Sequence, residues 1–374
     1  RGTNAVPRPP VRLRMARANQ ARLDLAALRH NLAHARQLAP ECKVMCVVKA
    51  NGYGHGALNV ARVFAPMADA LAVACIEEAI ELRDGGIETP ILLLQGVFEA
   101  QELIIASQQN FWVMVDNRQH LYWLEQARLP APVTCWLKID TGMHRLGVQP
   151  EEAAEFHQRL SSCENRTGEL VTCTHFASAD ELDKPQTTEQ LALFESITAD
   201  LPGPRSAANS SGLLGWPNSH YDWIRPGYML YGSSPFTATH PHTDTLRPVM
   251  TLCSAVISIR NVASGESVGY AANWTAQRPS RIATVSIGYG DGYPRLAANG
   301  TPVLINGQRA PLAGRVSMDM ITVDITDLDD VKLGDQVILW GEELPVSEVA
   351  AHAGTIGYEL TTRMPARTPR VVTD

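Results

Sequence analysis

Lys49 follows a run of five apolar residues, VMCVV, and opens the stretch KANGYGHG. An apolar setting disfavours the charged ammonium form, so it lowers the pKa of a lysine and leaves part of the amine neutral. A neutral, anchored amine is the group that forms a Schiff base with an aldehyde cofactor or a carbonyl substrate. The alternative is a lysine whose amine only extends from the end of a strand into water. The local pattern leaves both interpretations open.

The turn after Lys49 holds three glycines and the ring side chains of Tyr53 and His55. Glycine lets the backbone approach a ligand closely, and the Tyr53 hydroxyl can donate a hydrogen bond to a phosphate. The chain contains neither a Walker motif nor a strand-linked G-x-G-x-x-G. Binding of an ordinary nucleotide or dinucleotide therefore has no support.

Eight short apolar runs recur between residue 44 and about residue 230, with segments of helical spacing such as ALNVARVF between most of them. Continuous apolar strands that alternate with amphipathic helices indicate a parallel sheet covered by helices, and eight repeats predict a closed (β/α)8 TIM-like barrel. Lys49 then lies at the carboxyl end of the first barrel strand, the face where barrel enzymes carry their active sites. The expected strands are residues 44–48, 70–74, 90–94, 111–115, 133–139, 170–176, 205–209 and 222–228.

After about residue 240 the pattern changes to strands with turn signals and few helices. Asn306 and Gly307 stand between two strand-like runs, which is a strong signal for a β-hairpin. We therefore predict two domains, a (β/α)8 barrel over residues 15–240 and a mostly β domain over residues 241–374. The length of 374 residues fits this division, because single cores stop growing near about 250 to 300 residues.

Residues 1–14 contain four arginines, three prolines and no acid, and we interpret them as an artificial leader before Met15. Without them 28 basic residues stand against 39 acidic ones, so the formal net charge changes from -7 to -11. This balance disfavours nucleic acid as a partner. No apolar run approaches the roughly 18 residues of a membrane helix, and no signal peptide follows Met15.

The seven cysteines are odd in number and form no C-x-x-C pair. We therefore expect reduced thiols and a cytoplasmic protein without a membrane partner. His240 and His242 could suggest a metal site, but no further ligands cluster with them in the sequence. Asp327, Asp329 and Asp330 lack the glycine and glutamate of an EF-hand and indicate a solvated turn. We expect no metal.

The stretch VVKANGYGHG resembles the cofactor-lysine signature of the alanine racemases, which are pyridoxal phosphate enzymes that combine a (β/α)8 barrel with a β domain. Further segments resemble that family in the same order, from about Ala21 to the C-terminus. They are KIDTGMHRLG, THFASADE, ANSSG, IRPGYMLYG, VGYAANW, IGYGDGYPR, GRVSMDM and GYELTTR.

The resemblance implies that Lys49 carries pyridoxal 5'-phosphate and serves as one of two bases that interconvert L- and D-alanine. Racemisation removes the α-proton from one face and returns it to the other, so a second acid or base is needed on the opposite side. By resemblance this is Tyr270, supplied by the other subunit of a homodimer with shared active sites. A free phenol has a pKa near ~10, which must be lowered. The family comparison supplies His175, backed by Arg225, for this purpose.

Arg225 resembles the arginine that faces the ring nitrogen of the cofactor. Arginine only donates hydrogen bonds and stays charged, so the ring nitrogen beside it should remain unprotonated, which restrains transamination. An arginine at the barrel rim that pairs with a surface acid is the alternative. Arg145 resembles the arginine near the cofactor's phenolic oxygen and the substrate carboxylate. Lys138 resembles the lysine that some members carbamylate to hold that arginine.

The remaining assignments also come from the resemblance. Cofactor contacts, mainly to the phosphate, fall on Tyr53, Asn209, Ser210, Gly227, Tyr228 and Tyr358. The substrate carboxylate is expected at the backbone N–H of Met318, with Asp319 nearby, from the second subunit. The entry corridor is expected at Asp180, Tyr289, Arg295 and Arg315, where an ordinary surface or interface role is nearly as well supported.

The sequence is also compatible with other functions. A broad-specificity amino-acid racemase shares the architecture, and a non-catalytic pyridoxal phosphate carrier would need the lysine but neither the β domain nor Tyr270. Decarboxylases of the same fold group are expected to place an acid where Arg225 stands. The sequence does not decide between supply of D-alanine for peptidoglycan and D-alanine breakdown.

Overall fold

Eight parallel strands close into a barrel in the computed structural model, which describes residues 17–373. Closure is made by the last and first strands, where Lys43 pairs with Trp223 and Val44 with Ile224. All eight predicted strands are confirmed. Their bounds are β2 (Lys43–Val47), β3 (Ala70–Val73), β4 (Ile91–Leu93), β5 (Phe111–Val115), β6 (Val133–Lys138), β7 (Arg166–Cys173), β8 (Arg205–Ser206) and β9 (Trp223–Ile224).

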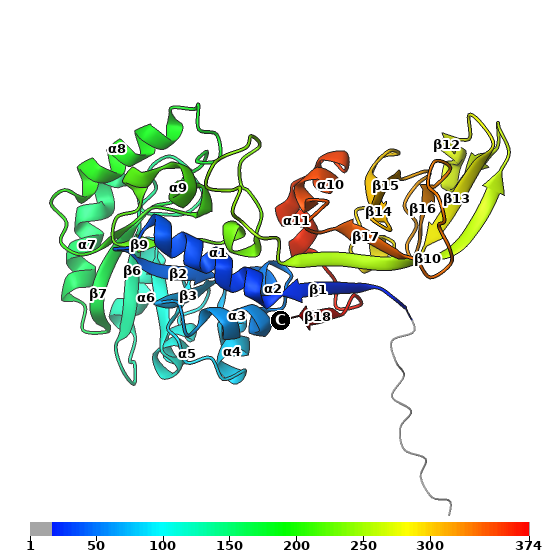
Figure 1. Cartoon of the computed structure of the whole chain (residues 1–374). Helices are drawn as coiled ribbons and strands as arrows, with labels where there is room; N and C mark the ends of the chain where they lie inside the picture. Colours follow the sequence, from blue (N-terminus) through cyan, green and yellow to red (C-terminus); the bar gives the residue numbers. More distant parts are fainter. Residues whose placement is uncertain (1–16, 374) are drawn as a thin grey trace, which may run out of the picture.

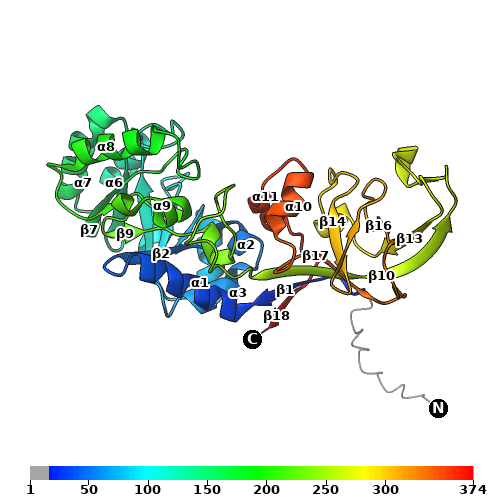
Figure 2. The ribbon, with the colours of Figure 1, turned by 45° about the horizontal axis from the view of Figure 1, so that its top comes forward.

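Helices surround the barrel, as Figures 1 and 2 show. Their apolar faces pack on the strands, most of whose residues are buried because both faces of the sheet are covered, although the first half of β7 extends beyond this cover. Three α-helix starts are fixed by side chains: Asp24 accepts from the Ala27 N–H, Asn117 from the His120 N–H and Asn209 from the Gly212 N–H, each at 2.9 Å. The helices are α1 (Leu25–Leu38), α2 (Lys49–Tyr53), α3 (Ala57–Phe64), α4 (Ile76–Asp84), α5 (Glu102–Gln109), α6 (Arg118–Gln126), α7 (Ala153–Ser162), α8 (Gln186–Thr198) and α9 (Ser210–Gly215), with short 3-10 turns η1 (Pro150–Glu152), η2 (Pro217–Ser219) and η3 (Tyr228–Tyr231).

The second domain is built on an eight-stranded, mostly antiparallel sheet and a separate two-stranded hairpin. The predicted hairpin at Asn306 and Gly307 is confirmed, because Ile305 pairs with Gln308. The elements are β10 (Met250–Val262), β11 (Ser267–Val268), η4 (Tyr270–Ala272), β12 (Trp274–Thr275), β13 (Ser280–Val285), η5 (Tyr289–Asp291), β14 (Pro302–Ile305), β15 (Gln308–Pro311), β16 (Ile321–Asp324), β17 (Gln336–Trp340), α10 (Val346–His352), α11 (Gly357–Thr362) and β18 (Arg370–Thr373).

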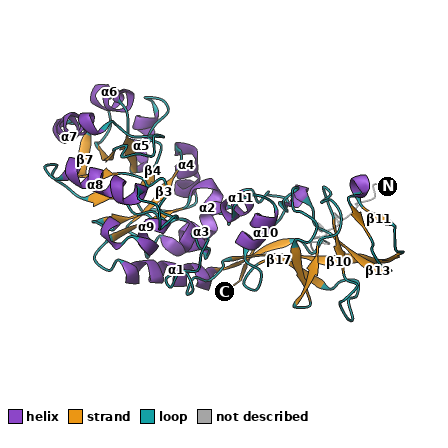
Figure 3. Ribbon diagram, turned by 90° about the horizontal axis from the view of Figure 1, so that it is seen from above, coloured by secondary structure: helices purple, strands orange, loops and turns teal. Residues whose placement is uncertain are grey.

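The first strand of the chain corrects the predicted barrel interval of 15–240. β1 (Gln20–Asp24) lies in the sheet of the second domain, antiparallel to β10 and parallel to β18. The physical reason is its alternating burial, which turns Ala21 and Leu23 into the second core instead of burying both faces as in a barrel strand. Figure 1 shows β1, β10 and β18 running together between the two domains, with β12 at the end remote from the barrel. Figure 3 places β11 at that same end.

A turn of unusual handedness follows β2. Ala50, Asn51 and Gly52 have φ between 52° and 60°, the left-handed region that L-residues avoid. The turn is held on both sides: the Glu78 carboxylate accepts from the Ala50 N–H at 2.7 Å, and Arg370 of the second domain donates to the Gly54 carbonyl at 2.9 Å. The contacts of Glu78 and Arg370 thus compensate for the backbone strain of the left-handed turn.

Gly54→Ala tests this contact between the domains. Gly54 has φ 81°, and a Cβ there would lie 1.7 Å from the Thr361 carbonyl oxygen. We expect a loss of about 2 to 4 kcal/mol in the free energy of unfolding, measured by chemical denaturation. Gly86→Ala is the matched control, because Gly86 has φ 85° but no atom within 4 Å of the added carbon, and it should lose about 1 kcal/mol. Equal losses in the two variants would contradict the steric explanation.

Candidate active site

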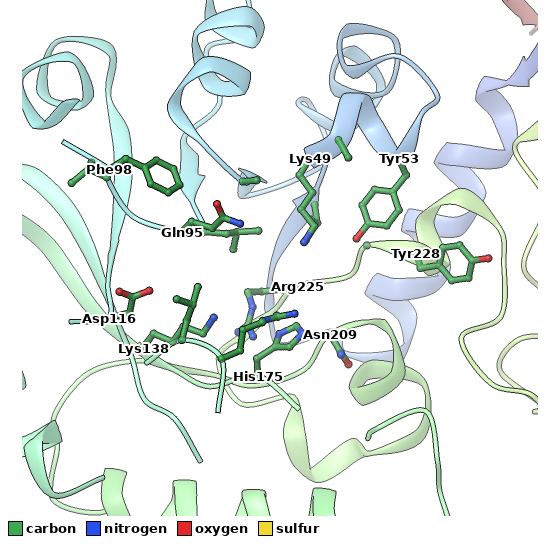
Figure 4. Close-up of a pocket in the computed structure, with 18 of the residues that line it drawn as sticks. Lys49, Tyr53, Gln95, Phe98, Asp116, Lys138, His175, Asn209, Arg225 and Tyr228 are labelled. Atoms are coloured by element: carbon green, nitrogen blue, oxygen red, sulfur yellow. The ribbon is translucent and has the colours of Figure 1, made fainter. Parts of the chain in front are cut away.

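A cavity of about 910 Å³ opens at the carboxyl ends of the barrel strands. Eleven residues predicted from the sequence line it, and Figure 4 shows several of them pointing inward from opposite sides. They are Lys49, Tyr53, Lys138, Arg145, His175, Asn209, Ser210, Arg225, Gly227, Tyr228 and Tyr358. The barrel gathers the residues from Lys49 to Tyr228, because the carboxyl ends of parallel strands meet at one face. Tyr358 joins them from α11 of the second domain.

The amine of Lys49 points into this cavity from the end of β2 (Figure 4). Burial lowers the pKa of Lys49, the positive charge of Arg145 lowers it further, and Glu78 opposes the shift. A lowered pKa is what the apolar strand before Lys49 predicts. An amine that only extends into water would not show it, so the structure favours the interpretation in which part of the amine is neutral and nucleophilic.

Arg225 lies on the opposite wall and is buried. Its guanidinium donates to the Thr174 carbonyl at 2.6 Å and to the Ser206 hydroxyl. No carboxylate lies within ion-pair distance of Arg225 among residues 17–373. The alternative of a rim arginine paired with a surface acid is therefore wrong, and the guanidinium is held instead by neutral oxygens from β7 and β8.

His175 lies beside Arg225 in the cavity (Figure 4). Burial and then the positive charges of Arg225, Lys138, Arg145 and Lys49 lower the pKa of His175 well below its ordinary value. The ring is neutral at neutral pH, so it can donate from one nitrogen and accept at the other.

Lys138 ends β6 and also reaches the cavity. Burial lowers its pKa, and the charges of Arg225 and Arg145 act in the same direction. Arg145 sits on an exposed loop whose preceding residues are fixed by Asp140, which accepts from the N–H groups of Gly142 and His144, each at 3.0 Å. The cavity lining holds four basic side chains and a single acidic one, Asp116. It is a strongly positive pocket in a chain of net negative charge.

The side of the cavity at Tyr53 and Tyr228 is lined by hydroxyls and by the starts of short helical turns. Ser210 begins α9 and Tyr228 begins η3, so their backbone N–H groups have no partner within those turns. The Ser210 hydroxyl accepts from the Gly227 N–H at 3.0 Å. A Cβ at Gly227 would lie 2.4 Å from the Tyr53 hydroxyl oxygen, so only glycine keeps this space open. Such donors suit a phosphate.

Seven predicted residues do not line the cavity of this chain. Asp180 is exposed but close enough for its charge to act on the Tyr358 phenol, whose pKa is raised first by burial. The other six lie in the second domain, and all of them are exposed: Tyr270, Tyr289, Arg295, Arg315, Met318 and Asp319. Tyr270 lies in η4 between β11 and β12, at the end of the molecule remote from the barrel (Figures 1 and 3).

The structure adds a group that the sequence analysis missed. Asp116 directly follows β5, and its carboxylate bonds to the His120 ring at 3.1 Å and to the Asn117 amide at 2.7 Å. One Asp116 oxygen is buried and has no hydrogen-bond partner in the described residues. The sequence did contain a signal for Asp116, because a polar residue directly after a barrel strand lies on the functional face of the barrel. Gln95 and Phe98 reach the same side of the cavity from the segment after β4 (Figure 4).

No group of three or more His, Cys, Asp or Glu side chains in residues 17–373 could hold a metal ion. Within the same residues, no helix combines the length and the apolar character that crossing a membrane requires. The seven cysteines are unpaired.

A closed barrel with a desolvated lysine at its mouth, followed by a β domain, defines a class of barrel enzymes that act through an amine. Models of the alanine racemase N-terminal and C-terminal domains match residues 23–235 and 249–372. The chain belongs to the alanine racemase family.

Individual alanine racemases are similar to this protein over nearly the whole length of the chain. Alanine racemase of Vibrio cholerae is 52% identical over 351 residues, which cover 94% of this chain and 97% of that protein. The biosynthetic alanine racemase of Shigella dysenteriae is 50% identical over 346 residues, which cover 92% of this chain and 96% of that protein. The solved biosynthetic alanine racemase from Pseudomonas aeruginosa has a TM-score of 0.93 and 48% identity, and covers 96% of this chain and 100% of that one. The predicted fold of a barrel followed by a β domain is confirmed.

The neutral state of His175 predicts a pH dependence of stability. Below pH ~6.5 the unfolded chain binds a proton at residue 175 that the folded chain refuses, so the free energy of unfolding falls by up to about 1.4 kcal/mol per pH unit. His175→Gln should remove this part of the slope in denaturation curves between pH 7 and 5.5. His352→Gln, which removes an exposed ring on α10, is the control. An unchanged slope in the His175 variant would show that the ring takes up its proton normally.

Proposed function

We propose that this protein interconverts L- and D-alanine with pyridoxal 5'-phosphate bound at Lys49. The observation that carries the proposal is the Lys49 amine, whose pKa is lowered by burial at the mouth of a positive cavity. Membership of the alanine racemase family supplies the substrate class. Two similar proteins, from Shigella dysenteriae and Pseudomonas aeruginosa, are biosynthetic alanine racemases, which supports a role in D-alanine supply for peptidoglycan over D-alanine breakdown.

The cavity residues fit pyridoxal phosphate. Tyr53, Ser210 and Tyr358 offer hydroxyls for the phosphate, together with the free N–H groups at the starts of α9 and η3. The space kept open by Gly227 lies beside Tyr53. When bound, the cofactor supplies an electron-withdrawing ring that makes the α-proton of an amino acid acidic. Four basic side chains in the lining match its phosphate and the substrate carboxylate.

Arg225 sets the electronic character of the site. A buried guanidinium fixed by the Ser206 hydroxyl and the Thr174 carbonyl can only donate to a ring nitrogen, and it keeps its own proton. A ring nitrogen bound beside it would remain unprotonated, which would moderate the electron-withdrawing strength of the ring and restrain transamination. A decarboxylase of the kind that carries an acid at this position is not supported.

Two proton carriers on opposite faces are needed, and one chain supplies only one of them. The Lys49 amine removes or returns the α-proton on its own face. Tyr270 is 68% exposed and belongs to the hairpin of β11 and β12, remote from the barrel. We therefore propose a homodimer in which the phenol of one subunit enters the cavity of the other, where the neutral His175 ring can exchange a proton with it.

The same dimer accounts for the other exposed residues of the second domain. Met318 and Asp319 would face the substrate carboxylate of the partner, and Tyr289, Arg295 and Arg315 would line the approach together with Asp180. We propose that the enzyme works in the cytoplasm with its cysteines reduced, a proposal supported by seven unpaired thiols. Carbamylation of Lys138, to hold Arg145, remains a proposal that the lowered pKa of the Lys138 amine favours.

The function is tested by incubating the enzyme with a panel of L-amino acids in deuterated water and following α-proton exchange and chirality together. We expect exchange and racemisation of alanine well above all other substrates. Lys49→Ala should abolish both, and it should lose the visible absorbance of the bound cofactor, because no amine remains to bind it. Comparable turnover of many amino acids would indicate a broad-specificity racemase, and cofactor binding without turnover would indicate a carrier.

Tyr270→Ala tests the shared site. It should keep the cofactor absorbance but lose most racemisation, about 100-fold or more, because one of two proton carriers is missing. Tyr122→Ala is the control, since Tyr122 is 56% exposed and does not line the cavity. Mixing Lys49→Ala and Tyr270→Ala chains should restore about a quarter of wild-type activity, because each mixed dimer keeps one complete site. No recovery on mixing would contradict a site built from two chains.

A further inference from the structure

Asp291 is a buried carboxylate of the second domain with two arginine partners. Its side chain is fully buried, and Arg17 approaches both of its oxygens, at 3.0 and 2.9 Å. Arg367 lies 3.1 Å from one of the same oxygens. The Gly288 N–H donates to the other oxygen at 3.0 Å. This carboxylate is firmly placed, because two guanidinium groups and a backbone N–H hold its two oxygens and compensate its buried charge.

Arg367 connects this carboxylate to the loop that precedes β16. The same guanidinium that contacts Asp291 also donates to the carboxylate of Asp319. Arg367 is 41% exposed, so it spans from the interior to the surface. Two arginines and two carboxylates balance in charge along this connection, from Arg17 through Asp291 and Arg367 to Asp319.

The turn that contains Asp291 also supports this loop through its backbone. The Tyr289 N–H donates to the Ser317 carbonyl at 3.0 Å, and the Gly290 N–H donates to the Met318 carbonyl at 2.8 Å. A Cβ at Gly288 would lie 2.2 Å from the Ser317 oxygen, so the loop rests directly on this turn. Both carbonyls of the loop are therefore directed toward η5.

These bonds fix the direction of the Met318 N–H. A trans peptide unit is planar, and its N–H points away from its own C=O. Because the Ser317 carbonyl is bonded to the turn beneath, the Met318 N–H of the same peptide unit is directed outward. It donates no hydrogen bond within residues 17–373, and the Met318 residue is 53% exposed. An unpaired donor in an exposed position is available to a ligand.

We propose that Asp291 and Arg367 are positioning residues that hold the Met318 N–H in place for the substrate carboxylate in the active site of a second copy of this chain. This inference rests on the proposed function, in which Met318 faces the partner's substrate. Neither residue touches the substrate. Their effect is on substrate binding, because a displaced donor weakens the hold on the carboxylate while Lys49 and Tyr270 keep their places.

Arg367→Met tests the proposal. It removes the contacts to Asp291 and Asp319 but leaves Arg17 on the buried carboxylate. We expect KM for alanine to rise roughly tenfold and kcat to change less than about threefold, with the visible cofactor absorbance retained. Asp291→Asn should shift KM in the same direction. Arg278→Met is the matched control, because it removes an exposed ion pair of the same domain, to Asp327 at 2.6 Å, and should leave KM unchanged.

Mixed dimers separate a positioning effect from general damage. A dimer of one Arg367→Met chain and one Lys49→Ala chain has its single working lysine under an unaltered second domain, so its KM should equal that of wild type. A dimer of one wild-type chain and one chain carrying both substitutions has that lysine under the altered domain and should show the raised KM.

The outcomes also separate this inference from the proposed function. If the wild-type enzyme fails to racemise alanine, the proposed function falls. If the wild-type enzyme is active and Arg367→Met leaves KM unchanged, only the positioning role is overturned. A raised KM that follows the chain carrying Lys49, instead of the opposite chain, also overturns it. Should Asp291→Asn fail to fold, the Arg367 variant and its mixed dimers decide the question.

Discussion

Desolvation of one amine is the constraint on which the rest of the structure depends. Lys49 can be partly neutral only because β2 ends inside a covered cavity and because Arg145 adds a like charge. The chain leaves this position through a left-handed turn, which is unfavourable for residues other than glycine. Glu78 on one side and Arg370 on the other hold that turn. The reactive group is thus held by contacts from both domains.

The electrostatics of the cavity follow from the same constraint. Lys138 and Arg225 are desolvated cations without a carboxylate partner in the described residues, an arrangement that is costly in an empty site. Such a pocket is best suited to anions, and the proposed cofactor phosphate and substrate carboxylate would supply them. The single acid, Asp116, is tied to His120 on the far side, away from Arg225 and Lys49 (Figure 4). Charge is therefore distributed to attract ligands and to keep His175 neutral.

The second domain has two separate tasks at its two ends. Near the barrel, α11 and Arg370 at the start of β18 contact the Lys49 turn of the same chain. At the other end, the hairpin with Tyr270 is directed into solvent in this chain. β10 spans 13 residues and connects the two regions, so the spacing between them is set by one continuous strand. In the proposed dimer each chain then stabilises its own lysine and completes the site of its partner.

The sequence alone determined the barrel, because buried parallel strands require continuous apolar runs, and it placed Lys49 at the active face, because a residue directly after a strand lies there. It also determined the hairpin at Asn306 and Gly307, whose turn chemistry is local. The tertiary structure decided that β1 joins the second sheet. It also decided that Asp291 meets Arg17 and Arg367. These pairings join segments far apart in the chain, and local periodicity carries no information about which distant segments meet.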